Sequence, residues 1–413
     1  MHVNLLEILR CPFCGGRVQL EQSACLEAHN DEIVTGILFC QCCAYPIVAG
    51  IPYMHIGPAA KTALRLLGAG DPHNALLTLL ELEESQHKDF ERLEAARDAM
   101  TFRQALDLLS PEAEGAYLLY RFSDPTFLSS QALLRAVGQD QRCFSKRALD
   151  LCGGTGHLTR SLCSLAGESD VVLADVFFWK IWLAKQFIAP RCQPVCCDAN
   201  VPLPFAKDSF SLAFCSDAFH YIWSRRLLAD EMQRLVGNSG TVLLSHLHNA
   251  CCDNLSAGMP LTPTGYRDLF EGYSPRLFKE SMVLNGLLQQ APMDLSTYHT
   301  DADLAQEPSL ILMASRLPGL FRVYAYTEGA EPPSAPTLNP LYQVERDGAA
   351  LYLTRSFPSD YYEMEYATCK QYLPERVRLL AGRPETLEIM THDSVSRELA
   401  QRYVVLNLPP HYV

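Results

Sequence analysis

Apolar runs of strand length alternate with helical stretches in the middle of this chain. Runs such as Ala148–Leu151 and Thr241–Ser245 are largely apolar, whereas the stretches between them place apolar residues three and four positions apart. The last of these runs is Ser309–Arg316. Alternating strand and helix units predict a mostly parallel sheet with helices on both faces. We therefore expect an α/β domain over residues 143–316.

The flanking segments have other patterns. Residues 58–142 are predicted to be helical, with proline between the segments. The expected helices are Ala75–Leu82, His87–Leu109 and Phe127–Val137. Residues 317–413 mix strand and helix patterns around a proline-rich stretch, which predicts a small α+β domain. Its expected elements are a strand at Phe321–Tyr326, a hairpin turning at Asp347 and Gly348, and a helix at Ser394–Arg402.

A glycine-rich turn follows the first predicted strand. Asp150 ends the strand, and the turn holds Cys152, Gly154 and Gly156, so the backbone can turn sharply and a ligand can approach closely. The spacing fits the G-x-G-x-x-G dinucleotide fingerprint in no register, and no Gly-Lys-Ser/Thr of a phosphate loop follows. The turn resembles the first motif of class I S-adenosylmethionine (SAM) methyltransferases, D-x-G-x-G-x-G, with Cys152 in place of the first glycine. A small residue can serve there.

Later motifs extend this resemblance. Asp175 ends the second predicted strand, Asp170–Asp175, close to the ~20-residue spacing at which a carboxylate reaches ribose hydroxyls. Cys197 to Ile222 is similar to the family's D-A-x-x-L-P-F…F-D-x-V…H pattern, and the resemblance implies that Asp198 accepts from the adenine amino group. The cofactor-binding residues implied in this way are Asp150, Cys152, Gly154, Gly156, Asp175, Val176, Asp198, Ala199 and Cys215.

Two Cys-x-x-Cys pairs lie within residues 1–57. Four thiolates match the closed tetrahedral shell of a structural Zn²⁺. The predicted ligands are Cys11, Cys14, Cys40 and Cys43, and Cys42 competes for the fourth place. Free or oxidised cysteines are the alternative interpretation. The segment also resembles the small zinc-ribbon proteins that bind and activate methyltransferases, here fused to the enzyme.

Composition narrows the functional classes. At 413 residues the chain is longer than the ~250–300 residues that usually share one hydrophobic core, so we expect two or three domains. Neither a run of ~18 apolar residues nor a signal-peptide pattern occurs, which favours a cytoplasmic protein without a membrane segment. The sixteen cysteines are then expected to be thiols or metal ligands. The net charge of −13 opposes nucleic acid as a partner, and residues 1–57 carry two arginines against five acids, so the ribbon is expected to support the fold.

The catalytic candidates lie near the predicted strand ends. Methyl transfer is an in-line displacement that needs alignment and exclusion of water, and an acceptor with a proton also needs a base. The candidate bases are His220 after the fourth strand and His246 and His248 after the fifth. Tyr117 and Tyr120 share one face of a helix expected to cover the cofactor, and Tyr120 completes the predicted catalytic set. His220 as a fold feature and the tyrosines as packing are the alternatives.

Two further segments bear on the substrate. Met259–Leu288 is expected to be a loop and helix inserted between strands five and six. Tyr266 and Arg267 in it either face the substrate or belong to a segment that merely caps the fold. For the aromatic cluster Phe357–Tyr362 we favour packing, either within a small core or at a homodimer contact. The alternative is that the cluster covers a substrate pocket.

The sequence thus favours a SAM-dependent methyltransferase that acts on a small molecule, for example in specialised metabolism, with S-adenosylhomocysteine as the cofactor product and Zn²⁺ in a structural role. The acidic charge and the extra C-terminal domain favour an enclosed pocket over a nucleic-acid groove. An RNA methyltransferase that uses the ribbon for recognition is the first alternative. A binding scaffold without catalysis is the second, and no residue excludes SAM chemistry other than methylation.

Overall fold

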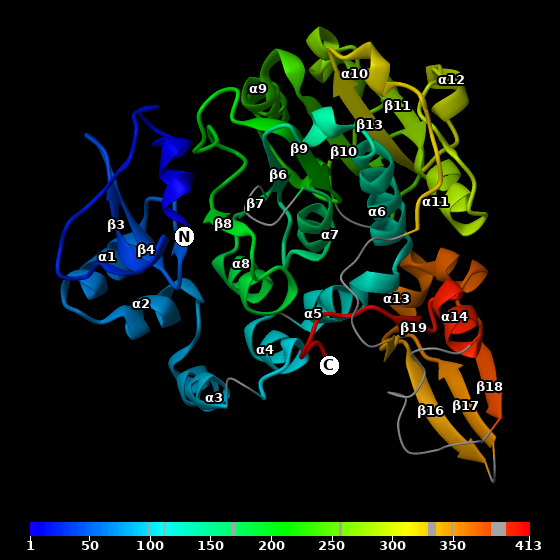
Figure 1. Ribbon diagram of the computed structural model, residues 1–413, viewed down its shortest axis with the longest axis horizontal. Coiled ribbons are helices and arrows are strands. Elements are labelled where there is room, and N and C mark those ends of the chain that lie inside the picture. Colours follow the sequence, from blue (N-terminus) through cyan, green and yellow to red (C-terminus); the bar gives the residue numbers. More distant parts are fainter. Residues whose placement is uncertain are drawn as a thin grey trace.

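The computed structural model arranges the chain as an N-terminal ribbon, a central α/β domain and a smaller C-terminal domain (Figure 1). The residues that the structure describes are 1–96, 99–110, 112–166, 171–255, 258–328, 336–347, 350–380 and 394–413. Each helix among them is too short or too polar to cross a lipid bilayer.

The ribbon is a small antiparallel sheet packed on the edge of the central domain. Its strands are β1 (Gln19–Leu20), β2 (Glu27–His29), β3 (Glu32–Phe39), β4 (Ala44–Val48) and β5 (Ile51–Pro52), paired in the order β1-β3-β4-β5 with β2 also on β3. Tyr53 forms a parallel bridge with Cys196, and the Met54 N–H donates to the Cys196 carbonyl at 2.8 Å. Leu5 and Leu9 share a hydrophobic core with the central sheet. The ribbon therefore contributes to the same core as the α/β domain.

The segment predicted to be helical forms helices, and two of them pack against different parts of the central domain. Its helices are α1 (Pro58–Gly68), α2 (Pro72–Leu79), α3 (Glu84–Ala95), α4 (Phe102–Leu109), α5 (Glu112–Tyr120) and α6 (Pro125–Gly138). The expected helix His87–Leu109 is thus two helices, α3 and α4. Proline begins α2 and α6, and the side chains of Asp71 and Asp124 cap them. Helix α6 is almost wholly buried and packs against the central sheet, whereas α5 lies over the strand ends.

The central sheet confirms the predicted α/β architecture. Its strands are β6 (Arg147–Leu151), β7 (Val171–Asp175), β8 (Gln193–Cys196), β9 (Phe210–Ser216), β10 (Thr241–His248), β11 (Arg276–Lys279) and β13 (Ser309–Ser315). Within the described residues their order is β11-β13-β10-β9-β6-β7-β8, and β13 runs antiparallel to both of its neighbours. Residue Asp170, expected to begin the second strand, lies outside the described residues.

Helices cover both faces of this sheet. The connecting helices are α7 (His157–Ala166), α8 (Phe178–Leu183), α9 (Arg225–Val236), α10 (Pro263–Leu269) and α11 (Glu280–Leu288). Helices α6, α7, α8 and α11 share one hydrophobic core, and α9 and α10 share the other with the ribbon. The prediction that Met259–Leu288 is an insertion between strands five and six was wrong, because this segment contains the edge strand β11. That strand has four residues and is charged at both ends, so it shows little strand pattern.

The C-terminal domain contains the predicted hairpin. Its larger sheet pairs β16 (Tyr342–Asp347), β17 (Ala350–Arg355) and β18 (Arg376–Leu380), and Gly348 of the expected turn lies outside the described residues. The other elements are α13 (Asp360–Glu365), α14 (Ser394–Gln401), β15 (Thr337–Leu338) and β19 (Val405–Leu406). The strand expected at Phe321–Tyr326 is only β14 (Val323–Tyr324), which pairs with β12 (Met293–Asp294). Tyr412 Oη donates to the carbonyl oxygens of Leu118 and Leu119, so the end of the described chain holds α5.

Candidate active site

A cavity of about 610 Å³ opens beyond the carboxyl ends of β6, β7 and β9. Parallel α/β sheets bind their ligands at this edge. The walls come from the glycine-rich turn after β6, from Asp175–Phe177 after β7 and from Ser216–Ala218 after β9. Helix α5 contributes Tyr117, and α13 contributes Tyr361 and Glu365. The cavity therefore lies between the central sheet, the helical lid and the C-terminal domain.

The turn after β6 has a left-handed backbone at several positions. Cys152, Gly154 and Gly156 have φ angles of 57°, 56° and 83°. A Cβ at Gly156 would lie 2.9 Å from the Cβ of Ala184, so a side chain there collides as well as straining the backbone. Cys152 adopts this conformation despite its side chain, at a cost of about 1–2 kcal/mol. Cys152, which stands where the motif has glycine, thus has the left-handed backbone that favours glycine.

Two acids predicted to bind the cofactor line the cavity. Asp175 Oδ2 accepts from the Gly154 N–H at 2.9 Å, and its Oδ1 accepts from the Phe177 N–H at 3.0 Å. Burial raises the pKa of Asp175, although the Lys180 ammonium and these N–H groups oppose it. Asp150 accepts from Thr159 Oγ1 at 2.6 Å, and burial raises the pKa of Asp150 to about 7.

The other predicted cofactor residues divide into two groups. Val176 lines the cavity and is 42% exposed. The residues outside its wall are Gly156, Asp198, Ala199 and Cys215. Asp198 Oδ1 accepts from the backbone N–H of Asn200 at 2.8 Å and from its amide at 3.0 Å. A hydrogen bond with buried Cys215, together with burial, raises the pKa of Cys152. The role of Asp198 toward adenine stays a prediction.

Asp217, directly after β9, is the functional candidate that the sequence analysis missed. It lines the cavity, and Tyr117 Oη donates to its Oδ2 at 2.7 Å. Arg121 Nη1 lies 3.4 Å from the same oxygen and 3.0 Å from Asp124 Oδ2. The backbone φ of Asp217 is 55°. An acid at the end of the fourth parallel strand was the available signal, but nothing local distinguished Asp217 from its neighbours.

His246 connects this acid to a second buried carboxylate. Its Nδ1 lies 2.7 Å from Glu280 Oε2, and its Nε2 lies 3.8 Å from Asp217 Oδ1. Ser129 Oγ donates to the other oxygen of Glu280 at 2.6 Å. Burial lowers the pKa of His246, but the carboxylates of Glu280 and Asp217 outweigh it and raise the pKa to about 9. An imidazole in this state carries a proton at neutral pH and is a poor base.

The remaining catalytic candidates have different surroundings. His248 comes within 4.8 Å of Asp217 and His246 through its ring nitrogen, and burial lowers its pKa to about 4. His220 is fully buried and stacks on His248 at 3.9 Å between ring centroids. Burial lowers the pKa of His220 to about 3. The ring of Tyr120 packs against Tyr362, 5.7 Å away, whereas Tyr117, one turn earlier, lines the cavity.

The segment around α10 caps the sheet. Tyr266 is fully buried, and its Oη donates to the His248 carbonyl at 2.8 Å. Arg267 pairs with Asp301. Of the two alternatives for these residues, these contacts favour the plain cap.

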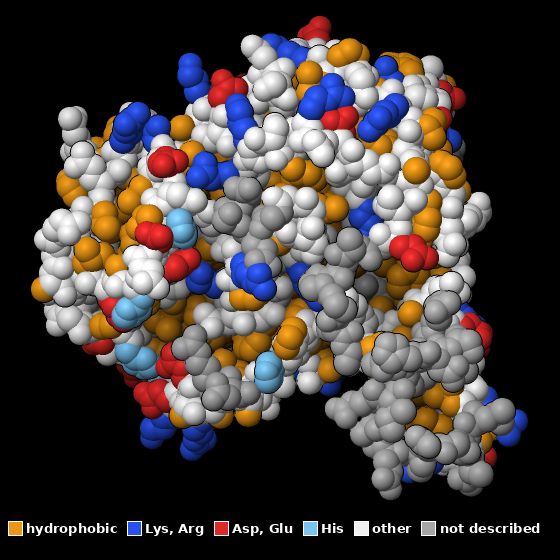
Figure 2. Space-filling view, viewed as in Figure 1, with side chains coloured by type: hydrophobic (Ala, Val, Ile, Leu, Met, Phe, Trp, Pro, Cys, Tyr) orange, Lys and Arg blue, Asp and Glu red, His pale blue; other side chains and the backbone are white. Residues whose placement is uncertain are grey.

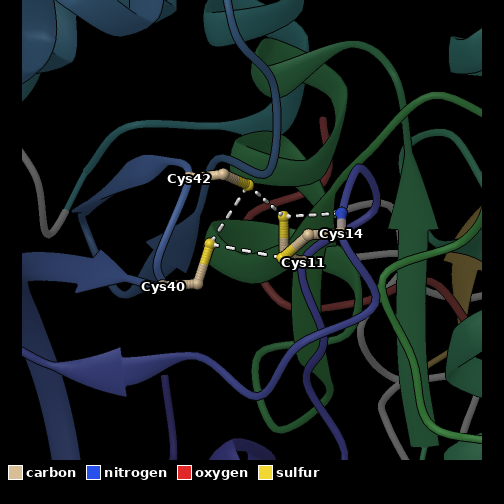
Figure 3. A group of neighbouring side chains, drawn as sticks. All are labelled: Cys11, Cys14, Cys40 and Cys42. Atoms are coloured by element: carbon tan, nitrogen blue, oxygen red, sulfur yellow. Dashed lines mark hydrogen bonds between the residues drawn. The ribbon is translucent and has the colours of Figure 1, made fainter.

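Figure 3 shows sulfur atoms of the ribbon that point toward one another. The thiols of Cys11, Cys14, Cys40 and Cys42 lie within 4.8 Å of one another. Cys43, which the spacing selects, is not in this group, and its Sγ lies 3.4 Å from that of Cys42. Backbone N–H groups donate to the sulfurs, from Cys14 to Cys11 Sγ at 3.5 Å and from Cys43 to Cys40 Sγ at 3.3 Å. Converging thiols with N–H donors fit a Zn²⁺ ion, and the structure gathers Cys42, in place of the predicted Cys43, with the other three thiols.

Known proteins resemble the part of the chain that builds the cavity. Residues 148–240 match a family described as a methyltransferase domain. A malonyl-[acyl-carrier protein] O-methyltransferase from Halorhodospira halophila is 31% identical over an alignment of 112 residues that covers 25% of this chain and 36% of the relative. The match thus spans about a third of that relative's length.

Solved structures give further likenesses at low sequence identity. One chain of the complex between the Haloferax volcanii Trm112 methyltransferase activator and a methyltransferase is 14% identical, with a TM-score of 0.37, over 49% of this chain and 93% of that chain. The geranyl diphosphate C-methyltransferase of Streptomyces coelicolor is 12% identical, with a TM-score of 0.34, over 46% of this chain and 77% of the other.

Proposed function

We propose that this chain, whose α/β domain is a class I SAM-dependent methyltransferase domain, transfers the methyl group of SAM to a small molecule bound in the cavity. We also propose that Zn²⁺ is structural in the ribbon. The observation that carries the first proposal is the composition of the cavity wall. It combines the glycine-rich turn and Asp175 with side chains of the lid and the C-terminal domain.

The residues divide the cavity into a cofactor end and an acceptor end. SAM supplies an activated methyl group on a sulfonium, so the chain has to bind, orient and exclude water. At the cofactor end, Asp175 has lone pairs left for the ribose hydroxyls beside its two backbone N–H donors. At the acceptor end, Asp217 is held by Tyr117, and α13 contributes Tyr361 and Glu365 to the same cavity wall as roof residues. This combination of acidic and aromatic groups would orient a small acceptor.

Size and charge favour a small acceptor over a nucleic acid. The volume of about 610 Å³ lies within the ~300–1,000 Å³ that is typical of small-molecule sites. On the face in Figure 2, Lys and Arg side chains are scattered among acidic and apolar ones over the ribbon and the central domain. Nucleic-acid binding surfaces instead collect basic side chains on one face. The net charge of −13 agrees with this distinction.

The proposal is tested by incubating the purified protein with methyl-labelled SAM and, in parallel, a total small-metabolite extract or total RNA. Label in the metabolite fraction supports a small acceptor. Label in RNA would overturn the substrate class while leaving methyl transfer in place. Binding of S-adenosylhomocysteine with label in neither fraction would favour the scaffold, and absence of binding would overturn the cofactor assignment.

Tyr361→Ala is expected to raise the acceptor KM about 10-fold and to leave the affinity for S-adenosylhomocysteine unchanged. Tyr361 lines the cavity from α13, and loss of an aromatic contact costs about 0.5–1.5 kcal/mol, up to roughly a factor of ten. Tyr352→Ala is the matched control, because Tyr352 lies on β17 of the same domain and stacks with Arg376. Equal KM changes in both variants would show that Tyr361 acts through domain stability and does not roof the acceptor.

A further inference from the structure

Negative charge accumulates around Asp217, which lines the cavity, whereas its neighbours Asp124, Glu280, His246 and His248 lie behind it, outside the cavity wall. Among the described residues in contact there, Asp124, Asp217 and Glu280 are carboxylates and Arg121 is the guanidinium. Asp124 and Glu280 are 0% and 7% exposed. A metal-bound imidazole is neutral, so in the metal-bound form three carboxylates against one guanidinium leave a formal charge of −2 on the protein. Without a metal, the proton on His246 reduces this excess to −1. Glu365 adds a half-buried carboxylate at the roof. Unpaired charge of this kind is costly to bury, so the site calls for a cation.

The side chains around this charge are oriented as metal ligands are. Glu280 holds His246 by Nδ1, which leaves Nε2 turned toward Asp217 Oδ1. Tyr117 and Arg121 both hold Asp217 by Oδ2, which leaves Oδ1 turned toward His246. A metal-bound histidine normally donates its second ring N–H to a carboxylate, and ligating carboxylates are themselves hydrogen-bonded. The 3.8 Å between Nε2 and Oδ1 is too long for a hydrogen bond and suits two atoms that share an ion.

The backbone is also shaped to bring these ligands together. The pairing of β10 with β13 shifts between Leu244 and Leu247, and His246 in this bulge has a φ of 53°. Asp217 on the neighbouring strand end has a φ of 55°. A non-glycine residue held in the left-handed region is strained, and such strain gathers at functional sites. The bulge places His246 and His248 within 4.8 Å of each other and of Asp217, measured between ligand atoms.

We propose that Asp217, His246 and His248 bind one divalent first-row transition-metal ion at the acceptor end of the cavity. Two imidazoles and one carboxylate suit this class of ion, and a charge of +2 neutralises the buried excess. Three protein ligands leave coordination positions open, as in catalytic metal sites. This site is separate from the cysteine cluster of the ribbon. Given the proposed function, the open positions would hold an oxygen or nitrogen atom of the acceptor, so the acceptor carries a metal-binding group.

The test uses the full-length protein with Zn²⁺ kept in the cysteine cluster, titrated with Co²⁺ alone. One further equivalent of Co²⁺ is expected, with the weak visible bands of nitrogen and oxygen ligands. Intense thiolate-to-cobalt absorption would instead report exchange into the cysteine cluster. Absence of this further equivalent of Co²⁺, or Co²⁺ bound only by cysteine, would overturn the proposal.

Variants locate the ion. Glu280→Gln removes the carboxylate that holds His246, and loss of such a partner typically lowers metal affinity ~10–100-fold. We expect a larger loss of Co²⁺ affinity when a ligand itself is replaced, in Asp217→Asn, His246→Gln or His248→Gln. The matched control is His220→Phe, which keeps a ring stacked on His248 and is expected to bind Co²⁺ like the unmodified protein. Unchanged binding in all three ligand variants would overturn the assignment.

Two measurements keep the result readable if a variant folds poorly. Anomalous diffraction at the cobalt edge from crystals of the unmodified protein is expected to show a peak between the three side chains, and a peak elsewhere alone would refute the site. S-adenosylhomocysteine binding, measured on the same preparations, separates this proposal from the proposed function. Intact cofactor binding without Co²⁺ binding overturns the metal site only.

Discussion

Asp175→Ala is expected to abolish measurable binding of SAM and S-adenosylhomocysteine by calorimetry while the protein stays folded. The carboxylate lines the cavity and accepts from the backbone N–H groups of Gly154 and Phe177, so it shapes the turn and, under the proposed function, binds the ribose. A hydrogen bond to a charged group contributes about 1.5–3 kcal/mol. Loss of two such bonds to ribose hydroxyls corresponds to at least about a 100-fold weaker affinity.

The controls separate binding from folding. Asp175→Asn keeps the shape and one acceptor oxygen, so an intermediate affinity is expected. Asp230→Ala removes an exposed acid from α9 and is expected to bind like the unmodified protein. Unaltered affinity in Asp175→Ala would remove the ribose assignment, and a large fall in its melting temperature would mean that the carboxylate mainly holds the turn together.

The cofactor end of the site could be predicted because its determinants are local. Asp150, Gly154 and Asp175 each stand at or just after the end of an apolar run. Parallel strands bring their carboxyl ends to one edge of a sheet, so these residues meet once the strands are identified. Sequence pattern and spacing therefore predicted that these three residues meet, whereas Asp198 and Ala199, predicted in the same way, lie outside the cavity wall.

The acceptor end depends on contacts between distant segments. Tyr117 and Asp217 are paired across 100 residues. Tyr117 and Tyr120 have similar helical patterns, and only the packing of Tyr120 on Tyr362 decides which of them reaches the cavity. The aromatic cluster of the C-terminal domain serves both alternatives, since Tyr362 lies in the small core and Tyr361 roofs the cavity. A periodic pattern shows that a residue is half-buried and does not show against what.

The ribbon illustrates the same limit at short range. Spacing selects Cys43 as the fourth ligand, whereas the structure gathers Cys42 with the other three thiols. A small rotation of the loop backbone decides which of two adjacent cysteines points its thiol into the cluster, and sequence spacing does not determine this rotation. Either choice would place the ion in a ribbon whose core is continuous with the sheet of the α/β domain.

Cys11→Ser is expected to remove about one Zn²⁺ per chain and to lower the melting temperature by on the order of 10 °C. Cys11 is buried in the cluster, and a structural Zn²⁺ contributes folding free energy directly. A loss of several kcal/mol corresponds to about 2–4 °C per kcal/mol in a domain of 150–250 residues. Because Met54 and Cys196 join the ribbon to the sheet edge, we expect the α/β domain to be destabilised as well.

Matched serine variants identify the fourth ligand and test the structural role of the metal. Cys25→Ser changes a cysteine of the ribbon outside the cluster and is expected to keep both the metal and the melting temperature. Of Cys42→Ser and Cys43→Ser, the one that loses Zn²⁺ names the ligand, and the structure favours Cys42. Loss of Zn²⁺ from Cys11→Ser with unaltered melting would contradict a structural ion. In that case the shared hydrophobic core alone would hold the ribbon to the α/β domain.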